Sequence, residues 1–194
     1  MNTSKLRPCA LFVVPLAGTV MAVLAACSQQ ATSPEALVKR GEYLVTIGSC
    51  NDCHTPWKMG PRGPEPDMSR MLSGHPADVK LPPPPALGNG PWMMTMAAMN
   101  TAFAGPWGIS YTANLTPSDS GVGKWTEDMF VRAMRTGKHM GLASGRPIQP
   151  PMPWPWVGKA TDEDLHAIFA YLKSIPPVDN VVPEPVIAPP PAAP

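Results

Sequence analysis

The feature that most constrains this chain is a five-residue motif, Cys50-Asn51-Asp52-Cys53-His54, with the pattern C-x-x-C-H. Two thiols at this spacing can each form a thioether with one vinyl group of the same porphyrin. The histidine that follows can give the iron an imidazole nitrogen. A redox-active dithiol is typical of a βαβ context, and a zinc site needs a second pair of ligands; the sequence shows neither. The motif therefore predicts one covalently attached haem c on Cys50 and Cys53, with His54 as an axial ligand.

The first residues predict an export signal. Lys5 and Arg7 precede an almost wholly apolar run that ends in Leu24-Ala25-Ala26-Cys27. This ending looks like the cleavage site of a bacterial lipoprotein, in which the new N-terminal cysteine carries acyl chains. An uncleaved anchor is the alternative, but the run is short for a membrane span.

We therefore expect a signal peptide at residues 1–26 and lipidation of Cys27, with the protein anchored by lipid on the periplasmic side of a membrane. Ser28, where known inner-membrane lipoproteins have aspartate, favours the outer membrane over the inner membrane. Covalent haem attachment in bacteria also takes place after export. The two signals therefore agree on the compartment.

Composition and charge limit the rest of the chain. We expect a linker at 27–33, one domain at 34–177 and a proline-rich tail at 178–194. The chain has 28 prolines, 16 glycines and 13 methionines in 194 residues, so much of it must be irregular. Lys and Arg number 15 against 14 Asp and Glu, so there is no basic footprint for nucleic acid.

Three helices have recognisable start signals. Ser33, Thr126 and Thr161 can each cap a helix, and each is followed by acidic residues in the first turn. Gly48 and Gly137 are placed to end the first two. The first helix carries a narrow apolar stripe with a glycine in it, which predicts that another helix crosses it closely.

Residues 55–123 are the least predictable part. They are rich in Pro, Gly, Met and Trp, and a structureless stretch of this length is unusual in a compact domain. We expect it to wrap around the haem. Residues 101–104 and 109–112 flank Gly105-Pro106-Trp107-Gly108, which predicts a small β-hairpin.

The order of these features resembles a class I cytochrome c domain: a capped helix, C-x-x-C-H, a Met-Pro loop and a terminal helix. More narrowly, Asn114-Leu115-Thr116-Pro117, Gly121-Val122-Gly123-Lys124-Trp125, Pro151-Met152-Pro153-Trp154 and Asp164-Leu165-His166-Ala167-Ile168 resemble the cytochrome subunits of bacterial membrane alcohol and sugar dehydrogenases. The match covers about Pro34 to Pro177. It implies an all-α, cytochrome c-like fold around one haem, with long irregular loops. Those subunits carry several haem motifs, whereas this chain carries one.

The resemblance also implies a methionine as the second axial ligand. Met152 lies in Pro150-Pro151-Met152-Pro153, ahead of the last predicted helix, and prolines on both sides restrict the backbone there. Methionine is also a common core filler, so position decides among the thirteen. The alternatives that remain are His139 and Met140, in a glycine-flanked loop, and, less favoured, His75 and His166.

Two classes of function follow from the iron ligands. A six-coordinate iron has no open position, which favours transfer of single electrons between redox partners. An open or displaceable distal site would instead favour a haem enzyme or sensor subunit. We expect an electron carrier and not an enzyme, with a haem edge exposed to a redox partner protein such as a dehydrogenase or a terminal oxidase chain. A haem-ligand histidine usually donates its other ring N–H to a carbonyl or carboxylate, and the sequence does not identify that acceptor.

Overall fold

The computed structural model describes residues 33–88 and 90–188. The predicted signal peptide, Cys27 and most of the predicted linker lie outside the described residues. So do the last six residues of the predicted tail. The chain divides into two units after Ala36, and every contact between elements discussed below lies within the second unit, from Leu37 onward. No helix within the described ranges is long and apolar enough to cross a membrane.

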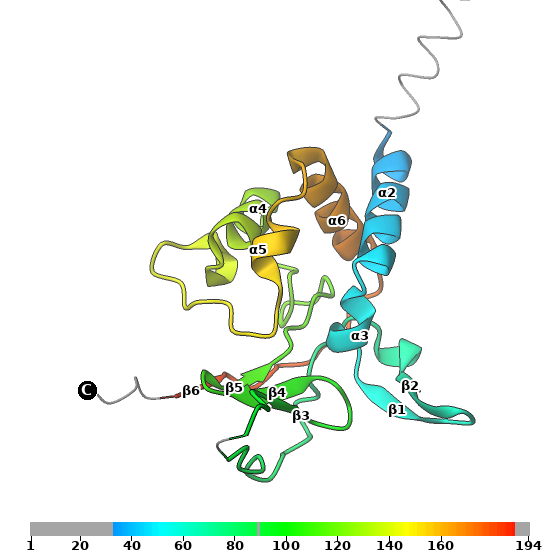
Figure 1. Cartoon of the computed structure of the whole chain (residues 1–194). Helices are drawn as coiled ribbons and strands as arrows, with labels where there is room; N and C mark the ends of the chain where they lie inside the picture. Colours follow the sequence, from blue (N-terminus) through cyan, green and yellow to red (C-terminus); the bar gives the residue numbers. More distant parts are fainter. Residues whose placement is uncertain (1–32, 89, 189–194) are drawn as a thin grey trace, which may run out of the picture. The chain divides into compact units, whose positions relative to one another are not determined.

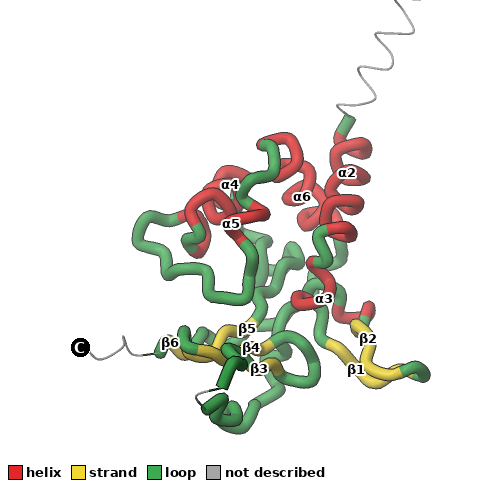
Figure 2. Tube along the Cα trace, viewed as in Figure 1, coloured by secondary structure: helices red, strands yellow, loops and turns green. Residues whose placement is uncertain are grey.

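The elements follow one another as short helices, short strands and then helices again (Figures 1 and 2). In chain order they are α2 (Pro34–Ile47), α3 (Cys50–His54), β1 (Trp57–Gly60), β2 (Gly63–Pro66), the 3-10 helix η1 (Met68–Arg70), β3 (Thr95–Met96), β4 (Ala102–Gly105), β5 (Gly108–Tyr111), α4 (Glu127–Thr136), the 3-10 helix η2 (His139–Gly141), α5 (Trp154–Val157), α6 (Asp162–Ser174) and β6 (Val186–Ile187).

The expectation of an all-α fold is wrong. The described chain contains a two-stranded antiparallel sheet, β1-β2, and a four-stranded antiparallel sheet in the order β3-β4-β5-β6. Each strand has only two to four residues, too few for the alternation of polar and apolar side chains to stand out in the sequence. The sheets form because the backbone of this Pro- and Gly-rich stretch still needs hydrogen-bond partners where it is buried.

The predicted β-hairpin is confirmed as β4-β5. Ala102 lies opposite Tyr111, and Gly105 lies opposite Gly108 across the turn. Gly108 has a φ of 106°, and a Cβ there would clash with the Val186 carbonyl of β6, so only glycine fits. The part of the predicted tail up to residue 188 therefore supplies an edge strand of this sheet.

The helix starts follow the predicted capping. Ser33 Oγ accepts a hydrogen bond from the Ala36 N–H at 3.1 Å. Thr126 Oγ1 accepts from the Met129 N–H at 3.2 Å, and Thr161 Oγ1 from the Asp164 N–H at 3.1 Å. Each hydroxyl satisfies a donor that the first turn of a helix leaves free.

The predicted close crossing of α2 is also confirmed. A Cβ on Gly41 would clash with the Ala167 carbonyl and would lie 2.7 Å from Tyr171 Cβ, so α6 crosses α2 at this glycine. The two helices lie beside each other in Figure 1. Residue 45, one turn further on, is a fully buried valine of the same core.

Candidate functional site: the C-x-x-C-H helix

The short helix α3 carries Cys50, Cys53 and His54 together, as the motif predicts. A helix of one turn cannot satisfy its own terminal carbonyls, so neighbouring segments must do so. The Asp52 carbonyl accepts two hydrogen bonds, from Trp57 Nε1 at 3.0 Å and from Asn100 Nδ2 at 2.7 Å. Side chains from β1 and from the segment after β3 thus hydrogen-bond to the helix that carries the motif.

A second network ties the end of α3 to the following loop. Thr55 is fully buried, and its hydroxyl donates to Asn51 Oδ1 at 2.8 Å. The same oxygen accepts from the Leu72 N–H, also at 2.8 Å. Because both bonds meet at one buried hydroxyl, the end of α3 is tied to the loop at Leu72.

His54 is held in one tautomer. Its ring is buried, and Nδ1 lies 2.8 Å from the Ala113 carbonyl oxygen, which can only accept, so Nδ1 carries the proton. Burial lowers the pKa of His54, and the bond to Ala113 opposes that shift. Nε2 makes no hydrogen bond to a described residue. A neutral imidazole with its Nε2 lone pair free is the form that ligates a metal.

The two thiols are free and half-buried. Burial raises the pKa of Cys50 and of Cys53, and the charge of Asp52 raises both further, while a backbone hydrogen bond works against the rise at Cys50. Cysteines that exchange disulfides need a lowered pKa. The electrostatics of α3 therefore do not suit a redox dithiol.

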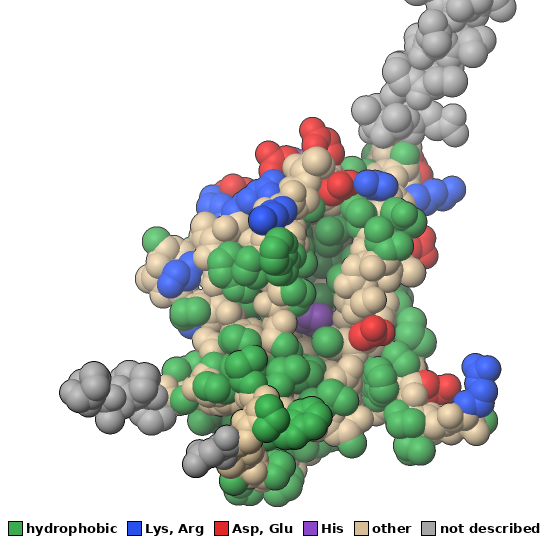
Figure 3. Space-filling view, viewed as in Figure 1, with side chains coloured by type: hydrophobic (Ala, Val, Ile, Leu, Met, Phe, Trp, Pro, Cys, Tyr) green, Lys and Arg blue, Asp and Glu red, His purple; other side chains and the backbone are tan. Residues whose placement is uncertain are grey.

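The donor set of α3 fits haem c. It offers two thiols one helical turn apart, a neutral imidazole with one free nitrogen, and a backbone carbonyl that orients the imidazole ring. That last feature is the usual companion of a metal-bound histidine. On the face shown in Figure 3, hydrophobic side chains are spread widely, while Lys, Arg, Asp and Glu gather in separate clusters.

Met152 comes from a different part of the chain, the loop that precedes α5. The short helix α5 therefore stands between Met152 and the last long helix, α6. Met152 is half-buried against the hydrophobic core. The loop is attached to the hairpin, because Ser110 Oγ on β5 donates to the Pro150 carbonyl at 2.6 Å.

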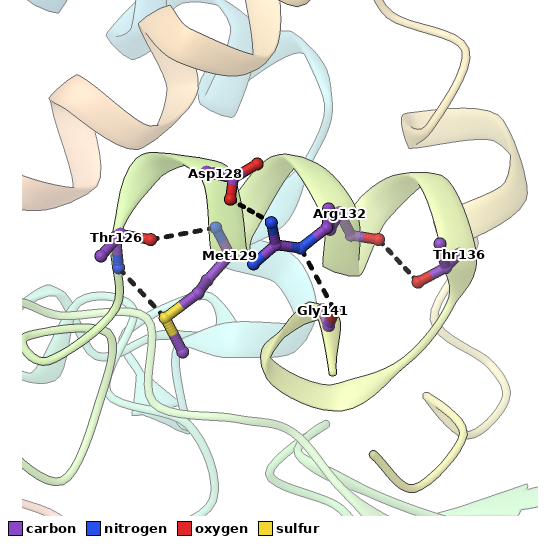
Figure 4. Close-up of polar contacts among 6 residues, drawn as sticks. All are labelled: Thr126, Asp128, Met129, Arg132, Thr136 and Gly141. Atoms are coloured by element: carbon purple, nitrogen blue, oxygen red, sulfur yellow. Dashed lines mark hydrogen bonds and ion pairs between the residues drawn. The ribbon is translucent and has the colours of Figure 1, made fainter. Parts of the chain in front are cut away.

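The loop that holds the alternatives His139 and Met140 is attached to α4 (Figure 4). Arg132 Nε donates to the Gly141 carbonyl at 3.3 Å, and Arg132 also pairs with Asp128. Met140 has a φ of 57°, an uncommon conformation for a side chain other than glycine. The His139 ring packs edge-on against Trp125 at 5.5 Å between centroids.

The other two histidines have different surroundings. His75 is fully buried and uses both ring nitrogens: Nδ1 contacts Thr101 Oγ1 at 3.0 Å, and Nε2 contacts the Val79 carbonyl at 3.2 Å. Neither nitrogen is free for iron. His166 is half-exposed on α6.

Several residues that shape the site were not predicted from the sequence. Ala113 contributes only a backbone carbonyl, which no side-chain pattern reveals. Asn100 and Trp57 donate hydrogen bonds to the Asp52 carbonyl, which is 48 residues from Asn100 and 5 residues from Trp57 in the chain. Asn114, which was noted only as part of a resemblance, turns out to be buried next to Ala113. The polar residues that flank the motif were the available sign that hydrogen bonds support it, but the partners in those bonds depend on the fold.

Comparison with known proteins finds relatives among cytochrome subunits of dehydrogenases. The gluconate 2-dehydrogenase cytochrome c subunit of Pantoea cypripedii is 30% identical over 138 residues, 71% of this chain and 23% of the relative. The alcohol dehydrogenase (quinone) cytochrome c subunit of Gluconobacter oxydans is 27% identical over 153 residues, 78% of this chain and 24% of the relative. The fructose dehydrogenase cytochrome subunit of Gluconobacter japonicus is 27% identical over 174 residues, 89% of this chain and 28% of the relative. No protein-family profile matches the chain.

The chain spans about a quarter of the length of these relatives. These relatives are named as cytochrome subunits of dehydrogenases. The matched lengths cover most of the present chain and so include most of its described residues. The homologues therefore support a cytochrome c domain in this chain, similar to part of the cytochrome subunits of these dehydrogenases.

Proposed function

We propose that this chain is a monohaem c-type cytochrome that passes single electrons between redox partners. The observation that carries the proposal is the arrangement on α3, where Cys50, Cys53 and His54 lie within one turn and His54 Nδ1 donates to the Ala113 carbonyl. Haem c, when bound, supplies an iron that is oxidised and reduced reversibly by one electron. The thiols of Cys50 and Cys53 would hold it covalently, and His54 Nε2 would be one axial ligand.

Met152 is our proposed second axial ligand. One short segment supports both candidate ligands, because Ser110 holds the Met152 loop through the Pro150 carbonyl and Ala113, three residues on, holds His54. A thioether opposite an imidazole favours the reduced iron and leaves no open coordination position. Such a site transfers electrons and does not bind a substrate at the metal.

We propose a dehydrogenase as the electron donor, because the relatives are named as subunits of dehydrogenases. A terminal oxidase chain is the corresponding acceptor. The lipobox-like sequence ending in Cys27 supports a lipid anchor on the periplasmic side, with the outer membrane favoured. Contacts between redox partners are small and short-lived, so the docking surface need not be large.

The covalent attachment is tested first. The full chain is expressed with a cytochrome c maturation system and examined by haem staining after denaturing electrophoresis. The wild type should retain haem, whereas Cys50→Ala and Cys53→Ala should each reduce it sharply because one thioether is lost. Full retention of haem through denaturation in both variants would contradict the proposal.

The second ligand is tested by the weak far-red band of a methionine-ligated ferric haem. Met152→Ala should remove this band, lower the midpoint potential and let carbon monoxide bind. Met140→Ala is the matched control and should leave the spectrum unchanged. The opposite pattern would assign the ligand to Met140. A wild type that lacks the band and binds carbon monoxide readily would favour the enzyme-or-sensor alternative.

The anchor is tested by fractionation. Cys27→Ser should abolish acylation and release the chain from the membrane fraction. A variant that stays in the membrane after a high-salt wash would show that the apolar segment itself is the anchor. Separation of inner and outer membranes then tests the sorting.

A further inference from the structure

We infer that Asn180 is a positioning residue for His54, acting through residues 178–180, which we call the C-terminal strap. The inference rests on the proposed function, because it concerns how the chain sets the properties of a haem ligand. His54 makes two hydrogen bonds to the rest of the domain, through its backbone carbonyl and through Nδ1. The strap contacts both of the backbone segments that provide these partners.

The first segment is the loop around Gly74. The Gly74 N–H donates to the His54 carbonyl at 2.8 Å. Asn180 Nδ2 donates to the carbonyls of the two residues that flank this glycine, to Ser73 at 2.7 Å and to His75 at 2.9 Å. The side-chain amide of Asn180 therefore binds the backbone on both sides of Gly74, the residue whose N–H donates to the His54 carbonyl.

The orientation of the Asn180 amide is set by its third partner. The Ala77 N–H donates to Asn180 Oδ1 at 2.9 Å, while both groups opposite Nδ2 are carbonyls that can only accept. The residue is 5% exposed. A buried amide with all of these bonds made is expensive to replace, because each partner left without a bond stays buried.

The second segment is the one that ends β5 and supplies Ala113. Asn114 follows Ala113 directly, and its Nδ2 donates to two carbonyls of the strap, to Val178 at 2.8 Å and to Asn180 at 3.3 Å. Asn114 Oδ1 accepts from the Thr116 N–H at 2.9 Å. The strap thus binds the side chain of the residue next to Ala113, whose carbonyl accepts the hydrogen bond from His54 Nδ1.

The two segments are also joined to each other. The His75 N–H donates to the Thr112 carbonyl at 2.9 Å, and the Leu115 N–H to the Leu72 carbonyl at 2.8 Å. A Cβ on Gly74 would lie 2.6 Å from the Ala113 carbonyl carbon, so the segments are in direct contact. With the strap lying across both, a shift of Asn180 moves the Ala113 carbonyl relative to the His54 ring.

The strength of the bond from Nδ1 to a carbonyl tunes a histidine ligand. A strong bond makes the imidazole a better electron donor, which stabilises the oxidised iron. Loosening the strap should therefore weaken donation by His54 and favour the reduced form. This effect is separate from any loss of folding stability, and it is what distinguishes a positioning role from a structural one.

The experiment compares Asn180→Ala and Asn180→Leu with the wild type, as full-length protein loaded with haem. Leucine is of similar size and uncharged, but it cannot donate to the carbonyls of Ser73 and His75. We expect the reduction equilibrium to move about tenfold toward the ferrous form in both variants, a size taken from the smallest effects that loss of an outer-shell partner has on metal affinity or activity. For a one-electron couple this is a rise of about 59 mV in the midpoint potential.

The control is Leu165→Ala, a cavity in the apolar core of α6, where residue 165 is fully buried. It should lower the free energy of unfolding without moving the potential. Asn180 variants that lose stability but keep the wild-type potential would show a purely structural strap and overturn the inference. A wild type without haem c would overturn the proposed function as well, so the two failures are distinguishable.

A measurement on the wild type covers the case in which the variants do not fold. Hydrogen exchange should show the Gly74 N–H and the His54 Nδ1–H opening in the same event as the Asn180 N–H, which donates to Ser120 Oγ at 2.9 Å. The protection factors should then agree within about threefold, since one opening controls all of them. Protection of the Gly74 and His54 protons that is tenfold or more above that of Asn180 would show that the strap opens without them.

Discussion

The helical region, α2 with α4 to α6, and the strand-and-loop region, β1 to β5 with residues 112–118 and the C-terminal strap, are stabilised in different ways. The helices enclose an apolar core in which, for example, the rings of Phe130 and Phe169 stack with centroids 5.4 Å apart. The strand-and-loop region, in which we include Thr55, buries apolar side chains such as Leu72 and Phe103, but it also buries polar ones: Thr55, Ser73, His75, Thr101, Ser110, Asn114, Thr116, Ser118 and Asn180.

The difference shows how each region obtains its order. In the helical region, backbone groups are satisfied locally and the side chains have only to be apolar and of suitable size. In the strand-and-loop region, backbone groups without regular partners are satisfied by Asn, Thr and Ser side chains from distant segments, as Asn180 does for the carbonyls of Ser73 and His75. The haem motif lies on α3, where the chain passes from the first region to the second.

The largest difference should appear on truncating the apolar core. Leu172 is 1% exposed on α6, and Leu172→Ala should lower the free energy of unfolding by about 2–5 kcal/mol through lost burial and a cavity. Denaturant titration of the haem-loaded protein measures the change. The volume-conserving control Leu172→Met should cost less than about 1.5 kcal/mol. Equal costs for the two variants would mean that the core near α6 is loosely packed.

A buried hydroxyl in the other region should cost less, and for another reason. Thr55→Val keeps the shape but leaves the buried Leu72 N–H without its acceptor, which should cost about 1–3 kcal/mol. Thr55→Ser keeps the hydroxyl and loses only a methyl group, so it should be the milder change. The comparison would break down if the serine variant were less stable than the valine variant, since packing would then outweigh the hydrogen bonds.

The buried histidine makes the strand-and-loop region sensitive to acid. Burial lowers the pKa of His75, with Arg70 lowering it further and the Val79 carbonyl and Asp78 opposing. The unfolded state therefore binds a proton more readily than the folded state. Stability should be complete above the unfolded pKa of about 6.5 and fall as the pH drops below it, by no more than about 1.4 kcal/mol per pH unit for this residue. The slope of unfolding free energy against pH should be shallower in His75→Gln. An unchanged slope would mean that other titrating groups cause the loss of stability in acid.

The smallest effect expected is the loss of a helix cap. Thr126 Oγ1 accepts from the Met129 N–H at the start of α4, and Thr126→Ala should cost about 1 kcal/mol (Figure 4). Thr126→Ser retains the acceptor and should be nearly neutral. Thermal unfolding followed by circular dichroism is adequate for both. A serine variant as unstable as the alanine variant would show that the methyl group, and not the cap, supports this end of α4.

The part of the site that could be predicted from the sequence is the part that is local. Cys50, Cys53 and His54 lie within one helical turn because they are neighbours in the chain, and this placement is observed on α3. The starts of the helices at Ser33, Thr126 and Thr161 and the β4-β5 hairpin were predictable for the same reason, since caps and tight turns are made within a few residues. The relatives imply haem c, while the single haem, its covalent attachment and Met152 as its ligand stay predictions.

What only the tertiary structure decided is everything that joins distant segments. The acceptor for His54 Nδ1 is the backbone carbonyl of residue 113, and the side-chain amide of the next residue, Asn114, donates to the carbonyls of residues 178 and 180. Among the strand pairs that overturn the all-α expectation, β5 with β6 also joins distant segments, whereas β1-β2, β3-β4 and β4-β5 pair near neighbours in the chain. Hydrogen bonds of this kind have no period in the sequence, because a polar side chain can satisfy any backbone group that the fold brings within 3 Å. The sequence therefore determines which residues bind the cofactor we propose, and the packing of the strand-and-loop region determines how firmly His54 is held.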